Sequence, residues 1–166
     1  MIAWIGNAAW ILAFGVLALF GLGQAGGLRG QPPSDLGVHD GRLKAPSNTR
    51  NSVSSQAWMF TGEGAQYARI DPLVFQGSEA GAMARLEAIV GSMPGARVID
   101  HRPDYLYAEF STHWLKFVDD VEFYLAPGSQ KIDVRSASRL GREDFGVNRA
   151  RMEAIRARFH GGQIAA

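Results

Sequence analysis

The chain has 166 residues, and its 17 basic and 16 acidic side chains give a formal net charge of +1. This length accommodates one compact domain plus an appendage. The near-neutral balance argues against nucleic acid as a general partner, because proteins that bind it usually carry a clear basic excess. The sequence contains no cysteine, which excludes disulfides, thiol catalysis and thiolate metal sites.

The first segment, from Ile2 to Gly23, has no charged residue, and Asn7 is its only strongly polar side chain. As a helix it would extend about 33 Å, which is enough to cross a hydrocarbon core of roughly 30 Å. A cleaved signal peptide is the alternative, but such peptides normally begin with basic residues, and no Lys or Arg precedes Arg29. We therefore predict a retained transmembrane anchor over residues 1–23.

The next segment, residues 24–56, is rich in Gly, Pro, Ser and Asn and lacks apolar periodicity. This composition is typical of an extended connection. We predict a tether over 24–56, part of which packs on the domain surface. A folded domain over 57–160 and a flexible tail over 161–166 complete the expected organisation.

The domain sequence predicts two helices and four strands. Ser78 is a good N-cap, and apolar residues at helical spacing follow it until Pro94-Gly95 ends the helix. Alternating or β-rich stretches then predict strands over 98–100, 105–110, 118–125 and 130–137. A last helix is expected to begin between Asp144 and Asn148 and to end at Phe159. The predicted fold is an α+β two-layer domain, a four-stranded antiparallel meander flanked by two helices.

Strand alternation also assigns side chains to the two faces of this sheet. If Leu125 pairs with Gln130 across the hairpin, Asp120 lies opposite Arg135 on the outward face. Tyr124 then lies opposite Lys131, and Tyr105 and Tyr107 share the outward face. This aromatic face is either covered by the tether or by residues 57–77, or used for binding, and we favour covering.

The stretch RSASRLGREDFGVNR, residues 135–149, joins the last strand to the last helix and permits two interpretations. As a structural junction, it has Asp144 as the N-cap, Gly146 in the turn, and Asn148 and Arg149 tying the loop to the sheet. As an anion site, it would combine a helix N-terminus with nearby guanidinium groups. We favour the structural interpretation. The anion-binding candidates are Arg135, Arg139, Arg142, Asn148 and Arg149, with Tyr105, Tyr107 and Tyr124 on the neighbouring face.

No residue pattern predicts a metal site, a cofactor site or a catalytic set. The carboxylates of Asp119, Asp120 and Glu122 do not converge, because alternation turns Asp119 away from the other two. The four histidines are scattered without metal-ligand spacing. No GxSxG sequence marks a nucleophilic serine. An enzyme would require Asp119 or Asp120 to converge with Arg135 and Ser136.

Several motifs resemble, in the same order, a bacterial and chloroplast family of unknown function numbered 1499. The resemblance covers nearly the whole part of the chain after the predicted anchor. The motifs are LGVHDGRL (36–43), VSSQ (53–56), MPGA (93–96), YLYAEFST (105–112), FVDDVEFYL (117–125) and RSASRLGREDFGVNRARMEAIR (135–156).

The resemblance implies a location but no activity, because the family has no established function. Its members typically carry a signal peptide, a lipid anchor or one N-terminal helix, which implies a periplasmic or thylakoid domain. Basic residues after the predicted anchor would instead place the domain in the cytoplasm. We favour the periplasm, because these basic residues are few and are interleaved with Asp35 and Asp40.

The chain departs from the family pattern at two positions. The family commonly carries two cysteines ahead of the domain, and the resemblance implies that they pair. Ala45 and Ser52 occupy the aligned positions here. The paired loss argues against a redox role and leaves the tether less constrained.

These observations favour a non-enzymatic, membrane-anchored accessory protein. Its globular domain would dock on a membrane complex, such as a respiratory or photosynthetic assembly, or on another envelope protein. The alternative is a lipid- or small-anion-binding module that uses the 135–149 loop and the tyrosine face.

Overall fold

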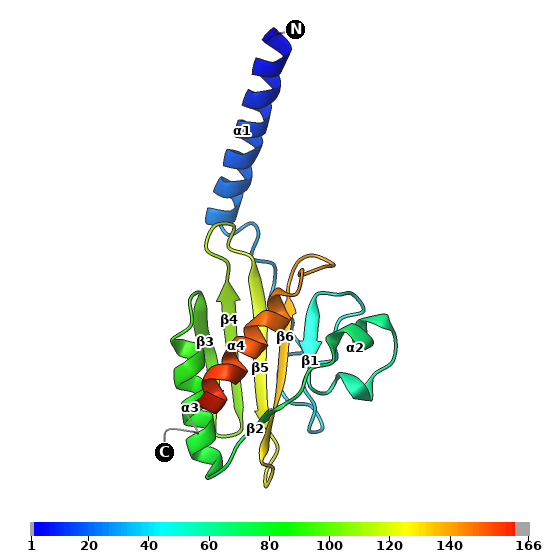
Figure 1. Cartoon of the computed structure of the whole chain (residues 1–166), viewed down its shortest axis with the longest axis vertical. Helices are drawn as coiled ribbons and strands as arrows, with labels where there is room; N and C mark the ends of the chain where they lie inside the picture. Colours follow the sequence, from blue (N-terminus) through cyan, green and yellow to red (C-terminus); the bar gives the residue numbers. More distant parts are fainter. Residues whose placement is uncertain (1, 162–166) are drawn as a thin grey trace.

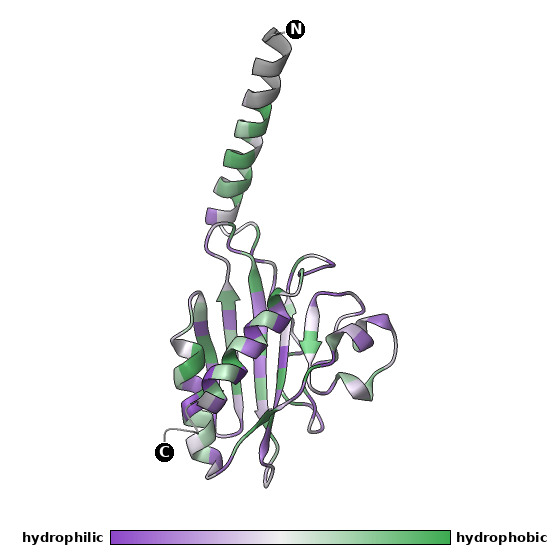
Figure 2. Cartoon of the chain, in the orientation of Figure 1, coloured by the Kyte–Doolittle hydropathy of each residue, from purple (hydrophilic) through white to green (hydrophobic). Residues whose placement is uncertain are grey.

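The computed structural model describes the backbone of residues 2–161 and the side chains of residues 10–161. A long helix, α1 (Ile2–Gln24), projects from one end of an α+β domain (Figure 1). In the described part of α1, large apolar side chains are exposed around the helix. Most of this stretch has the green colour of hydrophobic residues in Figure 2. They are Trp10, Ile11, Leu12, Phe14, Val16, Leu17, Leu19, Phe20 and Leu22.

No helix among residues 10–161 combines the length and apolar character needed to cross a membrane. The predicted span over 1–23 lies partly outside the residues whose side chains are described.

The domain is built on one antiparallel sheet with strand order β1-β6-β5-β4-β3, and β2 also pairs with β6. The four predicted strands are present, but the predicted count is wrong, because two short strands join the β6 edge. One of them lies inside the expected tether. The strands are β1 (Ser52–Ser54), β2 (Leu73–Val74), β3 (Ala96–Arg102), β4 (Tyr105–Ser111), β5 (Val118–Leu125) and β6 (Lys131–Ser138).

Two helices, α3 (Glu79–Gly91) and α4 (Val147–Gly161), cover one face of the sheet (Figure 1). Ser78 caps α3 as predicted, since its hydroxyl accepts a hydrogen bond from Gly81 N at 3.2 Å. A 3₁₀ turn, η1 (Ala57–Met59), and a short helix, α2 (Glu63–Ala68), lie between β1 and β2. The main core between sheet and helices includes Val53, Leu73, Phe75, Leu86, Leu106, Val121, Phe123, Ile132, Met152, Ile155 and Phe159.

The hairpin register differs from the predicted one by two residues. Leu125 lies opposite Ile132, so Arg135 faces Glu122 and not Asp120. Tyr124 correspondingly lies opposite Asp133, not Lys131. Because side chains alternate with a period of two, a two-residue shift leaves every residue on its predicted face. Alternation alone therefore cannot distinguish the two registers.

The N-terminus of α4 is held by Asp144, as predicted. Its carboxylate accepts hydrogen bonds from Asn148 N at 2.9 Å and from Gly146 N at 3.0 Å. The hydroxyl of Tyr67 donates a third bond at 2.9 Å. Burial alone would raise the pKa of Asp144, but these bonds to the charged form outweigh it and lower the pKa below its usual value.

Replacing this cap should destabilise the domain in a pH-dependent way. We expect Asp144→Ala to lower the free energy of unfolding by about 1–2 kcal/mol at pH 7, because it removes a helix cap. A carboxyl whose pKa is depressed on folding stabilises above its unfolded pKa, about 3.9, and loses this contribution as pH falls through the folded pKa. The difference from wild type should therefore shrink below about pH 4.

Urea unfolding followed by circular dichroism across the pH range measures this effect. Glu143→Ala, at the exposed neighbouring position, is the control and should change stability little. A destabilisation by Asp144→Ala that stayed constant down to low pH would contradict the ionic cap.

Candidate functional site

The face of the sheet opposite the helices carries the predicted tyrosines and is covered by the tether. A second buried apolar cluster joins Leu43 of the tether to Tyr105, Tyr107 and Tyr124. Leu36 and Val38 of the tether and Ala126 pack against the same cluster. The tether thus covers the aromatic face, as favoured from the sequence.

Glu122 lies at the centre of this face and is fully buried. One carboxylate oxygen accepts a hydrogen bond from Arg135 Nη1 at 3.0 Å. The other accepts from the Tyr105 hydroxyl at 2.8 Å and from the backbone N–H of Gly37 at 2.7 Å. Burial and the adjacent Glu122 raise the pKa of Tyr105 well above its usual value, so the phenol stays a donor. A backbone group of the tether therefore completes the shell of a buried carboxylate.

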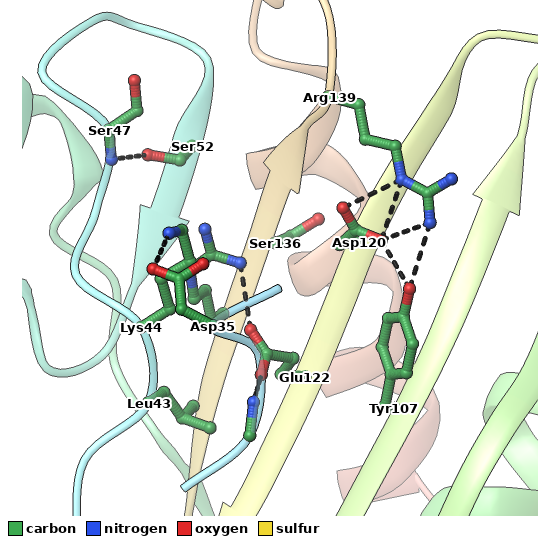
Figure 3. Close-up of polar contacts among 12 residues, drawn as sticks. Asp35, Leu43, Lys44, Ser47, Ser52, Tyr107, Asp120, Glu122, Ser136 and Arg139 are labelled. Atoms are coloured by element: carbon green, nitrogen blue, oxygen red, sulfur yellow. Dashed lines mark hydrogen bonds and ion pairs between the residues drawn. The ribbon is translucent and has the colours of Figure 1, made fainter. Parts of the chain in front are cut away.

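Asp120 and Glu109 hold a second buried cation, Arg139. Figure 3 shows Arg139 beside Asp120 and Tyr107. Arg139 Nη2 donates to Asp120 at 2.7 Å and to Glu109 at 2.6 Å, and Nε donates to both oxygens of Asp120. The Tyr107 hydroxyl donates to Asp120 at 2.6 Å. Burial alone would lower the pKa of Arg139, but its bonds to the two carboxylates outweigh burial and raise it. Arg139 is therefore a fixed cation of the structure.

Two further arginines reach Glu109 from the edge of the network. Arg97 Nη2 lies 2.7 Å from Glu109 and Arg29 Nη2 lies 3.4 Å away, and both side chains are substantially exposed. Burial acts to raise the pKa of Glu109, but hydrogen bonds from Arg97 and Arg139 lower it overall. Glu109 thus links three arginines.

The residues that an enzyme would have to bring together lie on opposite faces of the sheet. Asp119 and Ser136 lie on the helix face, where Arg151 Nη2 donates to Asp119 at 2.5 Å and Arg151 Nη1 donates to Ser136 Oγ at 3.0 Å. Ser136 also donates to Asn148 Oδ1 at 2.5 Å. Asp120 and Arg135 lie on the tether-covered face.

The candidate anion-binding arginines of the junction do not all converge. Arg135 and Arg139 lie on the tether-covered face, and Arg142 and Arg149 do not join them there. Arg139 points into the tether-covered network, whereas Arg149 donates to the carbonyl oxygens of Tyr67 at 2.5 Å and Arg69 at 2.9 Å. Arg142 is exposed. Asn148 ties the junction to the residue that precedes β1, because its amide donates to the carbonyl oxygen of Asn51 at 3.1 Å. Over the described residues, no group of three or more His, Asp or Glu side chains is arranged to hold a metal ion.

The positions at which the family resemblance implies cysteines lie where the tether meets β1. Ser47 N donates to Ser52 Oγ at 2.9 Å, as Figure 3 shows, and Ser52 is buried opposite Ala137. Ser52 occupies one of the two positions and Ala45 the other. The hydrogen bond to Ser52 therefore holds the tether segment that contains Ala45 against β1.

The buried and exposed arginines on Glu109 make a matched pair of variants. We expect Arg139→Gln to lower the free energy of unfolding by about 3–5 kcal/mol, because it leaves Asp120 buried without a cation and removes the buried partner of Glu109. Arg97→Gln removes an exposed cation from the same Glu109 and should cost less than about 1 kcal/mol. Urea unfolding of the full chain in detergent compares them, and equal losses would contradict the buried network.

Comparison with known proteins assigns the chain to a family but gives it no activity. No curated protein and no solved structure gives a significant match. A family model described as a protein of unknown function (DUF1499) matches residues 42–159. This match begins within the tether and ends near the close of α4, so it spans the sheet, both covering helices and part of the tether. The chain belongs to the DUF1499 family of proteins of unknown function.

Proposed function

We propose that this chain is a non-enzymatic accessory protein, anchored in a membrane by α1, whose domain docks on a partner protein at the membrane surface. The observation that carries the proposal is the exposed apolar surface of α1, which projects from the domain (Figure 2). An apolar helix without a protein partner is stable when lipid surrounds it.

The C-terminal end of α1 contacts the domain. These contacts would hold the domain at a defined distance from the bilayer. Gln24 Nε2 donates to the carbonyl oxygen of Trp114 at 2.7 Å, and the rings of Phe20 and Trp114 lie 6.2 Å apart. A side chain at Gly23 would meet the carbonyl oxygen of Leu115 at 2.6 Å, so the helix backbone approaches this loop closely.

The loops at this end of the domain present further exposed apolar side chains. Trp114 is 67% exposed and Phe145 is 91% exposed, and Leu140 and Val147 are also exposed. Phe145 has a φ of +52°, a conformation unusual for a bulky residue. Trp114 lies in the loop between β4 and β5, and Phe145 lies in the loop between β6 and α4. These two loops are adjacent, because residues of both line one cavity. Aromatic side chains at the lipid headgroup level would account for this exposure.

A different surface of the domain suits a protein partner. Trp58 is 67% exposed and Met59 is also exposed. Both line a cavity of about 700 Å³ together with Arg69 and Arg149. Tryptophan, methionine and arginine are enriched at protein interfaces, and tryptophan and arginine often supply most of the binding energy. We propose that this Trp58 surface contacts the partner.

We place the domain in the periplasm. The family resemblance supports this side, and so does the pairing of the basic residues that follow α1. Arg29 pairs with Glu109, Lys44 with Asp35 and Arg50 with Glu143. Three of the cations that argue for a cytoplasmic domain therefore belong to the folded domain surface.

Native electrophoresis of gently solubilised membranes tests the proposal. We expect the chain to remain in the membrane pellet after alkaline carbonate extraction and to migrate in a complex larger than the single chain. Trp58→Ala should release the chain from that complex, because it removes the main apolar contact. Ile99→Ala, an exposed apolar change on the opposite edge strand β3, is the matched control and should leave the complex intact.

Two outcomes would overturn the proposal. Extraction of the chain by carbonate would contradict the anchor. Migration as a single chain in every mild detergent would contradict docking on a partner.

A further inference from the structure

Two loops lie at the end of the domain from which α1 projects (Figure 1). They are residues 112–117, between β4 and β5, and residues 139–146, between β6 and α4, and we call them the tip loops. The end of α1 contacts Trp114 in the first tip loop. The backbone that follows α1 passes beside the second, because a side chain at Gly30 would meet Arg139 Cβ at 2.8 Å. Both tip loops therefore lie close to the C-terminal end of α1.

The tip loops present apolar side chains to solvent. Trp114, Leu140 and Phe145 are exposed, and so is Val147, the first residue of α4. Leu140, Phe145 and Val147 line one cavity of about 320 Å³ with Phe117 of the other loop. These side chains thus form a shared apolar surface, of the kind that marks an interaction site.

The backbone at Phe145 indicates that its side chain serves a contact outside the domain. Val147 N donates to the carbonyl oxygen of Asp144 at 3.1 Å, and φ is +52° at Phe145 and +84° at Gly146. A hydrogen-bonded turn with positive φ at both central positions is a type I′ turn, in which asparagine and glycine are preferred. Phenylalanine strains this turn, and with 91% exposure its ring gains little packing within the domain in return.

The charges of the tip loops favour an anionic partner surface. Among the described residues, Lys116 and Arg142 form no ion pair with a carboxylate. The carboxylates of the same loops are engaged, because Glu143 pairs with Arg50 and Asp144 is the buried cap of α4. Two cations therefore flank the apolar surface without an internal counter-charge.

We propose that the tip loops are a second membrane contact and bind an anionic lipid surface. The rings of Phe145 and Trp114 enter the headgroup region, and Lys116 and Arg142 attract anionic lipids. Apolar side chains flanked by basic ones bind such surfaces through both burial and charge. The proposal rests on the anchoring by α1 proposed above and adds that the domain itself binds the bilayer, which restricts its tilt.

The depth of Phe145 in a membrane tests this contact. Because the chain has no cysteine, Phe145→Cys, Leu17→Cys and Ile99→Cys each place one spin label. The full chain is reconstituted alone in vesicles of phosphatidylcholine and phosphatidylglycerol. Collisions with oxygen report lipid, and collisions with a neutral nickel chelate report water. We expect the labels at positions 145 and 17 to contact oxygen and lose nickel contact, and the label at position 99, on the exposed edge strand β3, to contact nickel.

The labels separate failure of this contact from failure of the anchor. Nickel contact at position 145, with position 17 in lipid, would overturn the second contact and leave the anchor intact. Shielding of position 145 from both reagents would mean that protein covers the loop and would also overturn it. Nickel contact at position 17 would contradict the anchor, whatever position 145 reports.

The lipid composition tests the role of the two cations. We expect phosphatidylglycerol to reduce nickel contact at position 145 at least about twofold relative to phosphatidylcholine alone. Lys116→Gln with Arg142→Gln should abolish this difference. The matched control is Lys131→Gln with Arg158→Gln, two exposed cations at the ends of β6 and α4 away from the tip loops, and it should keep the difference. No difference in the wild type, or the same loss in both double variants, would overturn anionic lipid as the partner.

Phe145→Asn separates the membrane contact from folding. We expect it to melt in detergent no lower than wild type, because the turn then has the asparagine–glycine pair it prefers. A spin label introduced by Leu140→Cys should gain nickel contact in this variant, since the inserted ring is lost. Ile99→Asn is the control and should leave that label shielded. A lower melting temperature for Phe145→Asn, or unchanged shielding, would contradict the proposal.

Discussion

The burial of charged side chains on one face of the sheet is the constraint on which the rest of the structure depends. Asp120, Glu122 and Arg135 are almost completely inaccessible on this face, although removing an ion from water costs several kcal/mol. The structure offsets this cost by pairing each charge and adding hydrogen bonds from tyrosines. Gly37 of the tether contributes one of these bonds to Glu122. The tether is therefore part of the folded domain and not a spacer.

The two faces of the sheet have different roles. The apolar face packs against α3 and α4 and supplies most of the hydrophobic stabilisation. The polar face contributes less net stability, because the attraction within its ion pairs only offsets the cost of removing the charges from water. These pairs do specify which residues of β5 and β6 lie opposite each other. A two-residue slip of the β5–β6 hairpin would keep the apolar face intact and separate Glu122 from Arg135. The ion pairs thus favour one register among those that the apolar pattern permits.

The sequence predicted elements defined by local or periodic signals and missed those defined by distant contacts. The four long strands, the Ser78 cap and the Asp144 cap follow from alternation and short-range hydrogen bonding. The strands β1 and β2 are too short to show alternation, and both are held by pairing with β6.

The tether and the candidate site were harder to predict for the same reason. The composition of residues 24–56 indicates an extended chain, and its order comes from bonds to residues far along the sequence, such as Glu122. The junction arginines looked alike in sequence, but Arg139 is buried among carboxylates and Arg149 binds backbone carbonyls. Side-chain type alone does not separate these arginines, whereas the backbone path decides which partners each one meets.

Hydrogen exchange at the backbone amides of Gly37 and Leu43 tests the central claim, that the tether closes the polar face, most directly. Gly37 N donates to Glu122, and Leu43 N donates to Gln56 Oε1 at 2.8 Å. If the tether belongs to the folded unit, these amides should exchange slowly, with protection within about tenfold of the amides in β5 and β6. Exchange at the rate of an unstructured peptide, while the sheet stays protected, would contradict the account.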